Sequence, residues 1–227
     1  MISIIIPVYN QADKISECLD GILNQSYKNF EIIVVNDGSK DNIFEVLDKY
    51  KDKIKSVNQE NGGSNPARNR GAKEARGDYL IFCDADIILE PTALEIMLKT
   101  LEEKPEASFA YSSFFWGKKL FKLWPYDSER LKKMPYIHTT ALIRREHFPG
   151  FDEKIKRFQD WDLWLTMLEK GHTGVWIDRI LYKVKTGGTI SSWLPAFIYK
   201  LMPFLPRVKK YNVAMDIIKN KHKILNE

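Results

Sequence analysis

The chain has 227 residues, of which 44% are hydrophobic and 29% are charged, and its formal net charge is +5. This composition is that of an ordinary folded protein and excludes a disordered or collagen-like chain. Two cysteines, no signal-peptide pattern and no apolar run of about 18 residues together predict a cytoplasmic protein without disulfides or a membrane-spanning helix.

The first 110 residues alternate strand-like and helix-like segments. Apolar runs that end in turn residues predict buried strands, and apolar residues at helical spacing predict amphipathic helices. In chain order the expected elements lie at residues 2–8, 12–25, 30–35, 41–50, 54–57, 65–76, 79–83, 91–103 and 109–111. This alternation predicts an α/β fold with a Rossmann-like, mainly parallel central sheet and helices on both faces.

The alternation weakens after residue 112. Residues 113–135 combine aromatic residues, lysines and two prolines, which indicates a loop-rich insertion. A strand is expected at 136–145, a helix at 160–170 and a closing pair of strands at 174–184. The expected organisation is a main domain in two halves followed by an amphipathic helical tail, at residues 1–190 (halves 1–112 and 113–190) and 191–227.

The positive charge of the chain is concentrated in its tail. From Arg179 to the end there are ten basic and two acidic residues, a net of +8, whereas the preceding 178 residues carry 25 basic and 28 acidic residues, a net of −3. A nucleic-acid-binding protein would carry this charge on its main body, so we expect no nucleic-acid partner. The apolar segment before Arg207, Lys209 and Lys210 predicts either peripheral contact with the inner face of a membrane through residues 193–210, or packing on the domain or a second copy.

Polar side chains follow three of the expected strands at the point where each strand ends. Asn10 follows the first strand, residues 36–39 follow the second, and Asp84 and Asp86 follow the fourth. Because ligands bind at the carboxyl ends of parallel strands, these residues predict a shared binding rim. Asp37 in the second cluster either forms a simple turn or accepts hydrogen bonds from a nucleobase or ribose.

Asp84 and Asp86 are two carboxylates spaced by one residue after an apolar strand. Such a pair can hold a hard divalent cation that keeps coordination positions open for phosphate oxygens. The D-x-D pattern alone carries little information, and its position after a buried strand is what favours a site. The preceding Cys83 is expected to be a small core residue.

Two further segments carry residues suited to chemistry. Residues 61–71 form a Gly-rich stretch before a helix in which Arg68 offers a guanidinium for phosphate, although the stretch matches neither the Walker A nor the GxGxxG pattern. Asp160 and Asp162 stand at the start of an expected helix beside tryptophans. Either Asp160 caps the helix and Asp162 favours its dipole, or a partly desolvated carboxylate acts as a general base.

Six short motifs occur in one order along the chain: Ser3–Asn10, Asn36–Ser39, Asn61–Gly71, Asp84–Asp86, Gly150–Glu153 and Asp160–Trp164. In this order they resemble family 2 glycosyltransferases over about residues 1–185, and six motifs together are far more specific than any one. The resemblance implies the GT-A fold and the inverting transfer of a sugar from a nucleotide-diphosphate donor, with a UDP-sugar favoured. The implied acceptor is the hydroxyl of a saccharide or lipid-linked saccharide, in surface polysaccharide, glycolipid or glycoprotein glycan synthesis.

The resemblance also implies roles for individual residues. Donor binding is assigned to Pro7, Tyr9, Asp37, Arg68 and Asp84. Asp86, with Asp84, would bind Mn²⁺ or Mg²⁺, which neutralises charge on the departing diphosphate. Asp160 would be the catalytic base that takes the acceptor proton. Acceptor-side candidates are His138, Trp161 and Asp162, whereas structural or surface roles are expected for His147, His172 and His222.

Two positions depart from the family pattern. Gln159 stands where the family usually has Glu, and we expect Asp160 to keep the base role. Lys185 stands near the place where many members have a histidine that completes the metal site. A charged lysine cannot replace that histidine, and we hypothesise that Lys185 binds the diphosphate directly and weakens the dependence on metal.

Two other functions were weighed against glycosyl transfer. A sugar-phosphate nucleotidyltransferase would carry a Gly-rich, basic loop directly after the first strand, where this chain has Tyr9–Ala12. A catalytically inactive nucleotide-sugar-binding or scaffold protein stays open because of Gln159 and the missing histidine.

Overall fold

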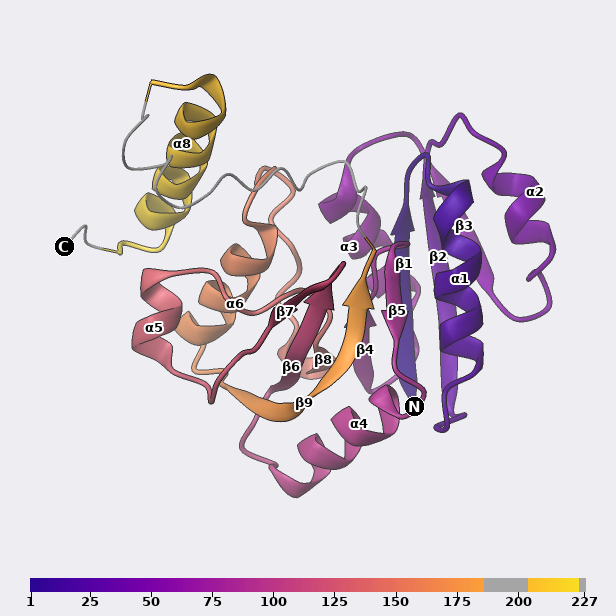
Figure 1. Ribbon diagram of the computed structural model, residues 1–227, viewed down its shortest axis with the longest axis horizontal. Coiled ribbons are helices and arrows are strands. Elements are labelled where there is room, and N and C mark those ends of the chain that lie inside the picture. Colours follow the sequence, from indigo (N-terminus) through magenta and orange to yellow (C-terminus); the bar gives the residue numbers. More distant parts are fainter. Residues whose placement is uncertain (186–203, 225–227) are drawn as a thin grey trace.

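The computed structural model describes residues 1–185 and 204–224, and Figure 1 displays them as a central sheet flanked by helices. The strands are β1 (Ile2–Val8), β2 (Phe30–Asp37), β3 (Lys55–Gln59), β4 (Tyr79–Phe82), β5 (Ile87–Leu89), β6 (Phe109–Trp116), β7 (Lys119–Phe121), β8 (Leu142–Arg144) and β9 (Gly174–Val184). The helices are α1 (Ala12–Leu23), α2 (Ile43–Asp48), α3 (Ser64–Glu74), α4 (Ala93–Glu103), α5 (Ser128–Lys133), α6 (Gln159–Glu169) and α8 (Pro206–Lys221), with a short 3₁₀ turn at Arg145–His147.

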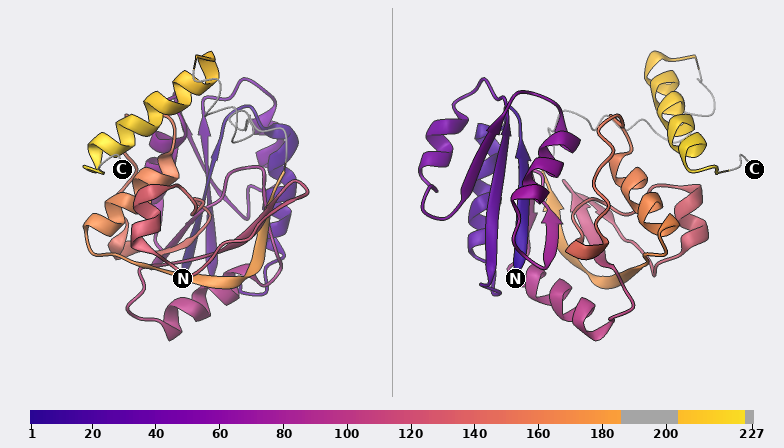
Figure 2. Two further views of the ribbon diagram at one scale, coloured as in Figure 1. Left: turned by 60° about the vertical axis from the view of Figure 1, so that its left-hand side comes forward. Right: turned by 180° about the vertical axis from the view of Figure 1, so that it is seen from behind.

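Within the described residues the strands form one mixed sheet in the order β3-β2-β1-β4-β8-β6-β9-β5, with β7 paired to β6. The first four strands in this order are parallel to one another, as predicted. Strand β8 joins β4 and β6 in antiparallel fashion, and β9 runs parallel to β6 and antiparallel to β5. Figures 1 and 2 place α1 and α2 on one face and α3 on the other, which confirms an α/β fold with both faces covered.

The strand β1 lies in the middle of the parallel half, and all seven of its residues are buried. Its apolar run reflects this position, because helices cover the sheet on both sides. A Cβ atom built on Gly71 of α3 would lie only 2.4 Å from Cγ2 of Ile5. A glycine at this position therefore lets α3 lie close against β1, and it brings the start of α3 to the carboxyl ends of β1 and β2.

The chain after residue 112 has more regular secondary structure than the loop-rich insertion expected from the sequence. Residues 113–135 contain the second half of β6, the strand β7 and the helix α5. The strand expected at 136–145 is reduced to the three residues of β8. The strand pair expected at 174–184 is the single strand β9, whose register with β6 shifts near Ser112 and Ser113. These strands pair with distant segments, so their sequence lacks a simple local alternation.

The helix α8 packs beside α6 at the side of the molecule remote from α1 and α2 (Figures 1 and 2). Pro206 stands in its first turn, where its missing N–H costs nothing. The helix expected over 193–225 is observed from residue 206, and its part up to residue 203 lies outside the described residues. Among the helices of residues 1–185 and 204–224, none combines the length and the apolar character needed to cross a membrane.

Candidate active site

A cleft of about 320 Å³ lies at the carboxyl ends of β1, β2 and β4. It brings together seven of the predicted site residues, namely Pro7, Tyr9, Asp37, Arg68, Asp84, Asp86 and His138. Asn61, Gly63 and Ser64 bring the predicted Gly-rich stretch to the lining, and Val8 belongs to the first motif. The lining is completed by Gln11, Trp116 and Val184, which the sequence did not single out for this role. The strand-end rim expected from the sequence is therefore a real cavity, and β6 and β9 add a wall that the sequence did not predict.

Asp37 fixes the Gly-rich loop against the end of β2. Its Oδ1 accepts hydrogen bonds from the Gly62 amide at 2.9 Å and from Nε2 of Gln59 at 2.7 Å, and its Oδ2 accepts one from the Gly63 amide at 2.8 Å. Gly63 has φ of 98°, a left-handed conformation that favours glycine. Asp37 thus shapes one wall of the cleft, while the ring of Tyr9 is 41% exposed at its mouth.

Arg68 is buried beneath the cleft and pairs with Asp84. Its Nη2 donates to Oδ1 of Asp84 at 2.6 Å, and its Nη1 lies 3.5 Å from Oε1 of Gln159. Burial by itself would raise the pKa of Asp84, but the positive charge of Arg68 and the neighbouring His138 outweigh it and hold that pKa below its usual value. Asp84 therefore stays ionised, and, because Gln159 is neutral, Asp84 is the one carboxylate that pairs with Arg68 among the described residues.

Among the described residues, no guanidinium pairs with Asp86 as Arg68 pairs with Asp84, and the positive charge of Lys14 offsets the rise in the pKa of Asp86 only in part. Burial and the negative charge of Asp84 raise the pKa of Asp86 to about 6. The backbone N–H of Lys185 donates to the backbone carbonyl of Asp86 at 2.9 Å, but the Lys185 ammonium pairs with Glu17 on α1. The structure therefore ties the end of β9 to the D-x-D turn through the backbone, while the Lys185 charge is engaged elsewhere.

The two carboxylates of the D-x-D turn fit a hard divalent cation. The raised pKa of Asp86 indicates a carboxylate that a positive charge would stabilise. In the part of the chain that the structure describes, no group of three His, Cys, Asp or Glu side chains is arranged to hold a metal. Mg²⁺ and Mn²⁺ are commonly bound through one or two carboxylates together with phosphate oxygens and water, so Asp84 and Asp86 suit a cation that arrives with a diphosphate.

Asp160 is the second residue of α6 and is partly buried. It is not among the residues that line the cleft, but it lies close enough to the lining residues His138 and Arg68 for them to affect its pKa. The helix begins from Phe158, whose φ of 59° is left-handed, so the capping role considered for Asp160 is wrong. Oδ1 of Asp160 accepts a hydrogen bond from the Trp161 amide at 2.9 Å. Burial raises the pKa of Asp160, and the neighbouring His138 and Arg68 offset only part of the increase. A raised pKa suits a carboxylate that must accept a proton.

His138 lines the cleft and is close enough to Asp84 and Asp160 for both carboxylates to affect its pKa. Its Nδ1 accepts a hydrogen bond from the Thr140 amide at 3.1 Å. Because a backbone N–H can only donate, the neutral ring carries its proton on Nε2. Burial lowers the pKa of His138, and the charges of Asp84 and Asp160 oppose this effect only partly. His138 is therefore a neutral donor at the side of the cleft nearest Asp160.

The other two acceptor-side candidates do not line the cleft. Trp161 is fully buried, and its indole N–H donates to the backbone carbonyl of Leu131 at 2.6 Å. The Asp162 side chain is 3% exposed and contacts α8 through Lys221 and His222. Both residues lie on α6 next to Asp160, which is why the sequence grouped them, but the helix directs their side chains into the interior.

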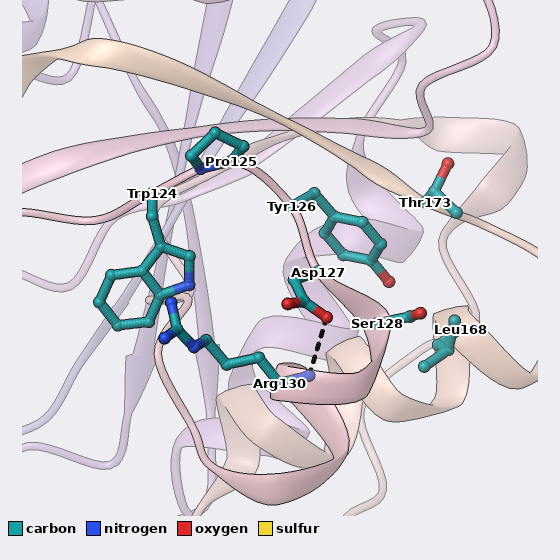
Figure 3. Close-up of a pocket in the computed structure, with 8 residues that line it drawn as sticks. All are labelled: Trp124, Pro125, Tyr126, Asp127, Ser128, Arg130, Leu168 and Thr173. Carbon is teal, nitrogen blue, oxygen red and sulfur yellow. Dashed lines mark hydrogen bonds between the residues drawn. The ribbon is translucent and has the colours of Figure 1, made fainter.

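A second hollow lies at the far end of α6, away from the strand ends (Figure 3). It is lined by Trp124, Pro125, Tyr126, Asp127, Ser128, Arg130, Leu168 and Thr173. Two of its charged side chains serve the local fold, since Asp127 accepts hydrogen bonds from the first amides of α5 and the Arg130 guanidinium lies 4.3 Å from the Trp124 ring centroid. Tyr136 packs against the same indole with ring centroids 5.1 Å apart. The D-x-D turn and Asp160 make the strand-end cleft the candidate active site.

The sequence model of glycosyl transferase family 2 matches residues 3–161, from β1 through the cleft residues to the start of α6. The chain belongs to this family. This glycosyltransferase is 32% identical to an uncharacterized glycosyltransferase of Rickettsia typhi, a match that covers the whole chain and 78% of that protein. It is also 32% identical to the chondroitin synthase of Pasteurella multocida, over 75% of the chain but 19% of the synthase. The chain spans about a third of two other Rickettsia relatives, at 34% of their length.

Solved structures confirm the GT-A fold of the glycosyltransferase. Staphylococcus aureus TarS in complex with UDP-GlcNAc superposes with a TM-score of 0.72 at 19% identity, covering 91% of this chain and 66% of TarS. The mannosyltransferase PcManGT of Pyrobaculum calidifontis, in complex with GDP-Man and Mn²⁺, gives a TM-score of 0.65 at 19% identity, covering 93% and 64%. At these identities the likeness establishes the fold, and the chemistry of the cleft has to be argued from its own residues.

Proposed function

We propose that this glycosyltransferase transfers a sugar from a nucleoside diphosphate to an acceptor hydroxyl with inversion at the anomeric carbon. Asp160 takes the proton of the attacking hydroxyl, and Pro7, Tyr9, Asp37, Arg68 and Asp84 hold the donor. The observation that supports this proposal is a cleft lined by Arg68, Asp84 and Asp86, together with a separate, partly buried carboxylate of raised pKa, Asp160, close to His138 and Arg68.

The electrostatic surroundings support this division of roles. Asp84 is held ionised by Arg68, so it suits ground-state binding of the ribose or of a cation. Asp160 has no such cation within hydrogen-bond distance among the described residues, and its pKa is raised instead. Carboxylates whose pKa values are driven apart by their surroundings commonly serve different steps. We expect His138, with its proton on Nε2, to donate a hydrogen bond to an acceptor hydroxyl near Asp160.

A divalent cation is expected to bind together with the donor. Asp86, with Asp84, would hold Mn²⁺ or Mg²⁺, which supplies positive charge to the departing diphosphate. The Mn²⁺ in the structure of the Pyrobaculum mannosyltransferase supports this assignment. Lys185 would add to the same charge only after leaving Glu17, so we expect its contribution to be smaller than that of Asp86.

The named relatives and neighbours support a UDP-sugar donor and a saccharide acceptor. TarS has been solved with UDP and with UDP-GlcNAc, and the Pasteurella relatives are named chondroitin synthase and hyaluronan synthase. These names favour growth of a surface polysaccharide or of a lipid-linked saccharide. They leave the sugar itself to be determined by measurement.

The donor is tested by calorimetric titration of UDP, GDP, dTDP and CDP, each with and without Mn²⁺. We expect UDP to bind, and to bind more tightly with Mn²⁺ in the wild type but not in Asp86→Asn. Equal binding with and without Mn²⁺ would move the diphosphate role to Arg68 and Lys185. No binding of any nucleotide would contradict the proposed function.

The reaction is tested with Asp160→Asn and the UDP-sugars. Loss of the base is expected to lower kcat by about 10²- to 10⁴-fold while nucleotide binding stays unchanged. If wild type and Asp160→Asn bind the nucleotide equally and neither turns over any donor, with or without saccharide acceptors, the inactive binding or scaffold protein becomes the better description.

We also propose that the outer side of α8 contacts an anionic membrane surface. Val213 and Ile217 are 59% and 51% exposed, one helical turn apart, and Phe204 just before the helix is 64% exposed. The basic residues Arg207 and Lys210 are exposed on the same helix. An apolar strip accompanied by lysine and arginine favours the headgroup region of an anionic bilayer. Residues 193–203 of the expected contact lie outside the described residues.

Vesicle flotation tests this contact. A variant with Arg207, Lys209 and Lys210 changed to Gln should bind phosphatidylglycerol-containing vesicles about 100-fold more weakly, since each basic residue contributes about 1 kcal/mol at such a surface. A matched variant with Lys49, Lys51 and Lys53 changed to Gln removes the same charge near α2 and should bind like the wild type. Equal binding of the two variants, or binding only to uncharged phosphatidylcholine, would contradict the proposal.

A further inference from the structure

The helix α8 is attached to the segment that carries Asp160. Val208 and Ile218 are fully buried on its inner side. The ring of Tyr211 meets the ring of Phe158 edge to face, with centroids 5.1 Å apart, and the Arg157 guanidinium lies 5.4 Å from the Tyr211 centroid. Phe158 is the residue from which α6 begins, two positions before Asp160, so the contact is made next to the proposed base.

The most buried contact of α8 is with Asp162, two residues after Asp160. The Asp162 side chain is 3% exposed, and Oδ1 accepts from Nζ of Lys221 at 2.7 Å and from Nε2 of His222 at 2.9 Å. A buried carboxylate is costly unless a cation and hydrogen-bond donors accompany it. Both partners come from the end of α8, so the start of α6 depends on that helix for its charge balance.

The same two basic residues also reach both sides of Asp162. Lys221 donates to Oδ2 of Asp152 at 2.9 Å, in the loop before α6. His222, whose side chain is 2% exposed, contacts Glu169 through Nδ1 at 2.8 Å, at the end of α6. Together Lys221 and His222 join the loop, the first turn and the last turn of the helix that carries the proposed base.

The loop held by Lys221 also touches the donor side. The backbone carbonyl of Asp152 accepts a hydrogen bond from Nδ2 of Asn65 at 2.8 Å, and Oδ1 of Asn65 lies 3.4 Å from Nη1 of Arg68. A chain of contacts therefore runs from α8 through Asp152 and Asn65 to the guanidinium that pairs with Asp84. A shift of this loop would change the position of Asp160 relative to Arg68.

We infer that Lys221 and His222 are positioning residues that hold the Asp160 helix in register with the donor side of the cleft. They touch neither the cleft nor the reacting atoms, and they act through Asp152 and Asp162. The expected effect on turnover, which is the catalytic part of the inference, rests on the proposed glycosyl transfer. The expected loosening of the start of α6, which is the mechanical part, can be measured whatever the protein catalyses.

Hydrogen exchange of the full chain tests the mechanical part. The test variants Lys221→Met and His222→Phe remove the charged contacts and keep most of the side-chain volume. The variant Lys221→Arg keeps the charge. Lys223→Met is the matched control at the next exposed lysine. In the first two variants, amides of residues 151–155 and 158–165 should exchange about tenfold faster or more, as the loss of a hydrogen bond between charged groups implies. Lys221→Arg and Lys223→Met should exchange like the wild type.

Turnover tests the catalytic part, at a temperature where circular dichroism reports every variant as folded. Lys221→Met and His222→Phe should lower kcat several-fold with unchanged KM for the donor and unchanged calorimetric affinity for UDP, and Lys221→Arg should restore kcat. Exchange that matches Lys223→Met would overturn the inference, and faster exchange with unaltered kcat would reduce the contact to a structural one. A wild type that neither binds UDP nor turns over would instead contradict the proposed function, and the exchange comparison would still decide whether α8 holds the helix.

Discussion

Four aspartates near the cleft carry the same side chain in four different electrostatic surroundings. Asp84 faces Arg68 and stays ionised, whereas Asp86 lies beside Asp84 and has its pKa raised to about 6. Asp160 is partly buried, and its neighbours offset only part of the resulting rise in pKa, whereas Asp162 pairs with two basic residues at the end of α8. The neighbours of each carboxylate, more than its place in the sequence, determine whether it suits cation binding, proton transfer or structural support.

The raised pKa of Asp160 predicts the acid side of the pH profile. A general base works in its deprotonated form, so kcat should rise with pH through a pKa that lies above the ordinary aspartate value of 3.8. The pH dependence of kcat at saturating donor measures this limb. In Asp160→Asn the residual rate should lack it, and a limb that persists there would assign the base to another group.

The ion pair of Arg68 and Asp84 predicts a stability effect. Arg68→Met would leave the Asp84 carboxylate without its cation in a partly buried position, and the free energy of unfolding should fall by about 2 kcal/mol. Urea unfolding measures the change. The control is Arg70→Met on the same helix, where the side chain is 53% exposed and its ion pair with Glu74 should be worth less than about 1 kcal/mol.

At the scale of elements, the cleft is built by close packing of α3 on the sheet. The start of this helix supplies the Gly-rich loop and Arg68, and Gly71 allows the helix to lie against Ile5. Of these features, the apolar runs predicted β1, β2 and β4, and the strand-end polar residues predicted the rim. The wall formed by Trp116 and Val184 was not predictable in the same way, because β6 and β9 meet across a long sequence separation.

Two glycines in helices should respond in opposite ways to alanine. In Gly71→Ala the new methyl group would meet Ile5, and the free energy of unfolding should fall by about 1–3 kcal/mol. In Gly21→Ala of α1 the nearest atom is 3.7 Å away, so the change should raise stability by about 0.5–1 kcal/mol through helix propensity. Thermal unfolding of both variants is the measurement, and equal effects would contradict the packing described for α3.

At the scale of the whole molecule, ion pairs join the C-terminal helix α8 to the sheet domain. The sequence predicted a basic helix in the tail and left its partner open between a membrane and the domain. It could not predict the contact of Asp162 with His222, because the two residues are 60 positions apart and share no local pattern. Asp162 was grouped with Asp160 by proximity in the chain, although helical geometry separates their side chains.

The contact of His222 makes the stability of the molecule depend on pH. Burial opposes the charged ring, but hydrogen bonds to Asp162 and Glu169 outweigh it and raise the pKa of His222 above 6.5. A group whose pKa is raised by folding stabilises the protein fully below its unfolded value and loses this effect as pH rises through the folded value. The stability difference between wild type and His222→Phe in urea should therefore be larger at pH about 6 than at pH about 9. An equal difference at both pH values would contradict a charged His222.

The pairing of the last sheet strand also dictates when the cleft can form during synthesis. The short strand β5, which follows the D-x-D turn directly, pairs with β9 in the described sheet, and the Asp86 carbonyl receives its hydrogen bond from Lys185. On the ribosome, the first four parallel segments emerge early, but this turn gains its backbone partners only after nearly a hundred further residues have been made. The end of the cleft that we propose to bind the cation is therefore completed late in synthesis.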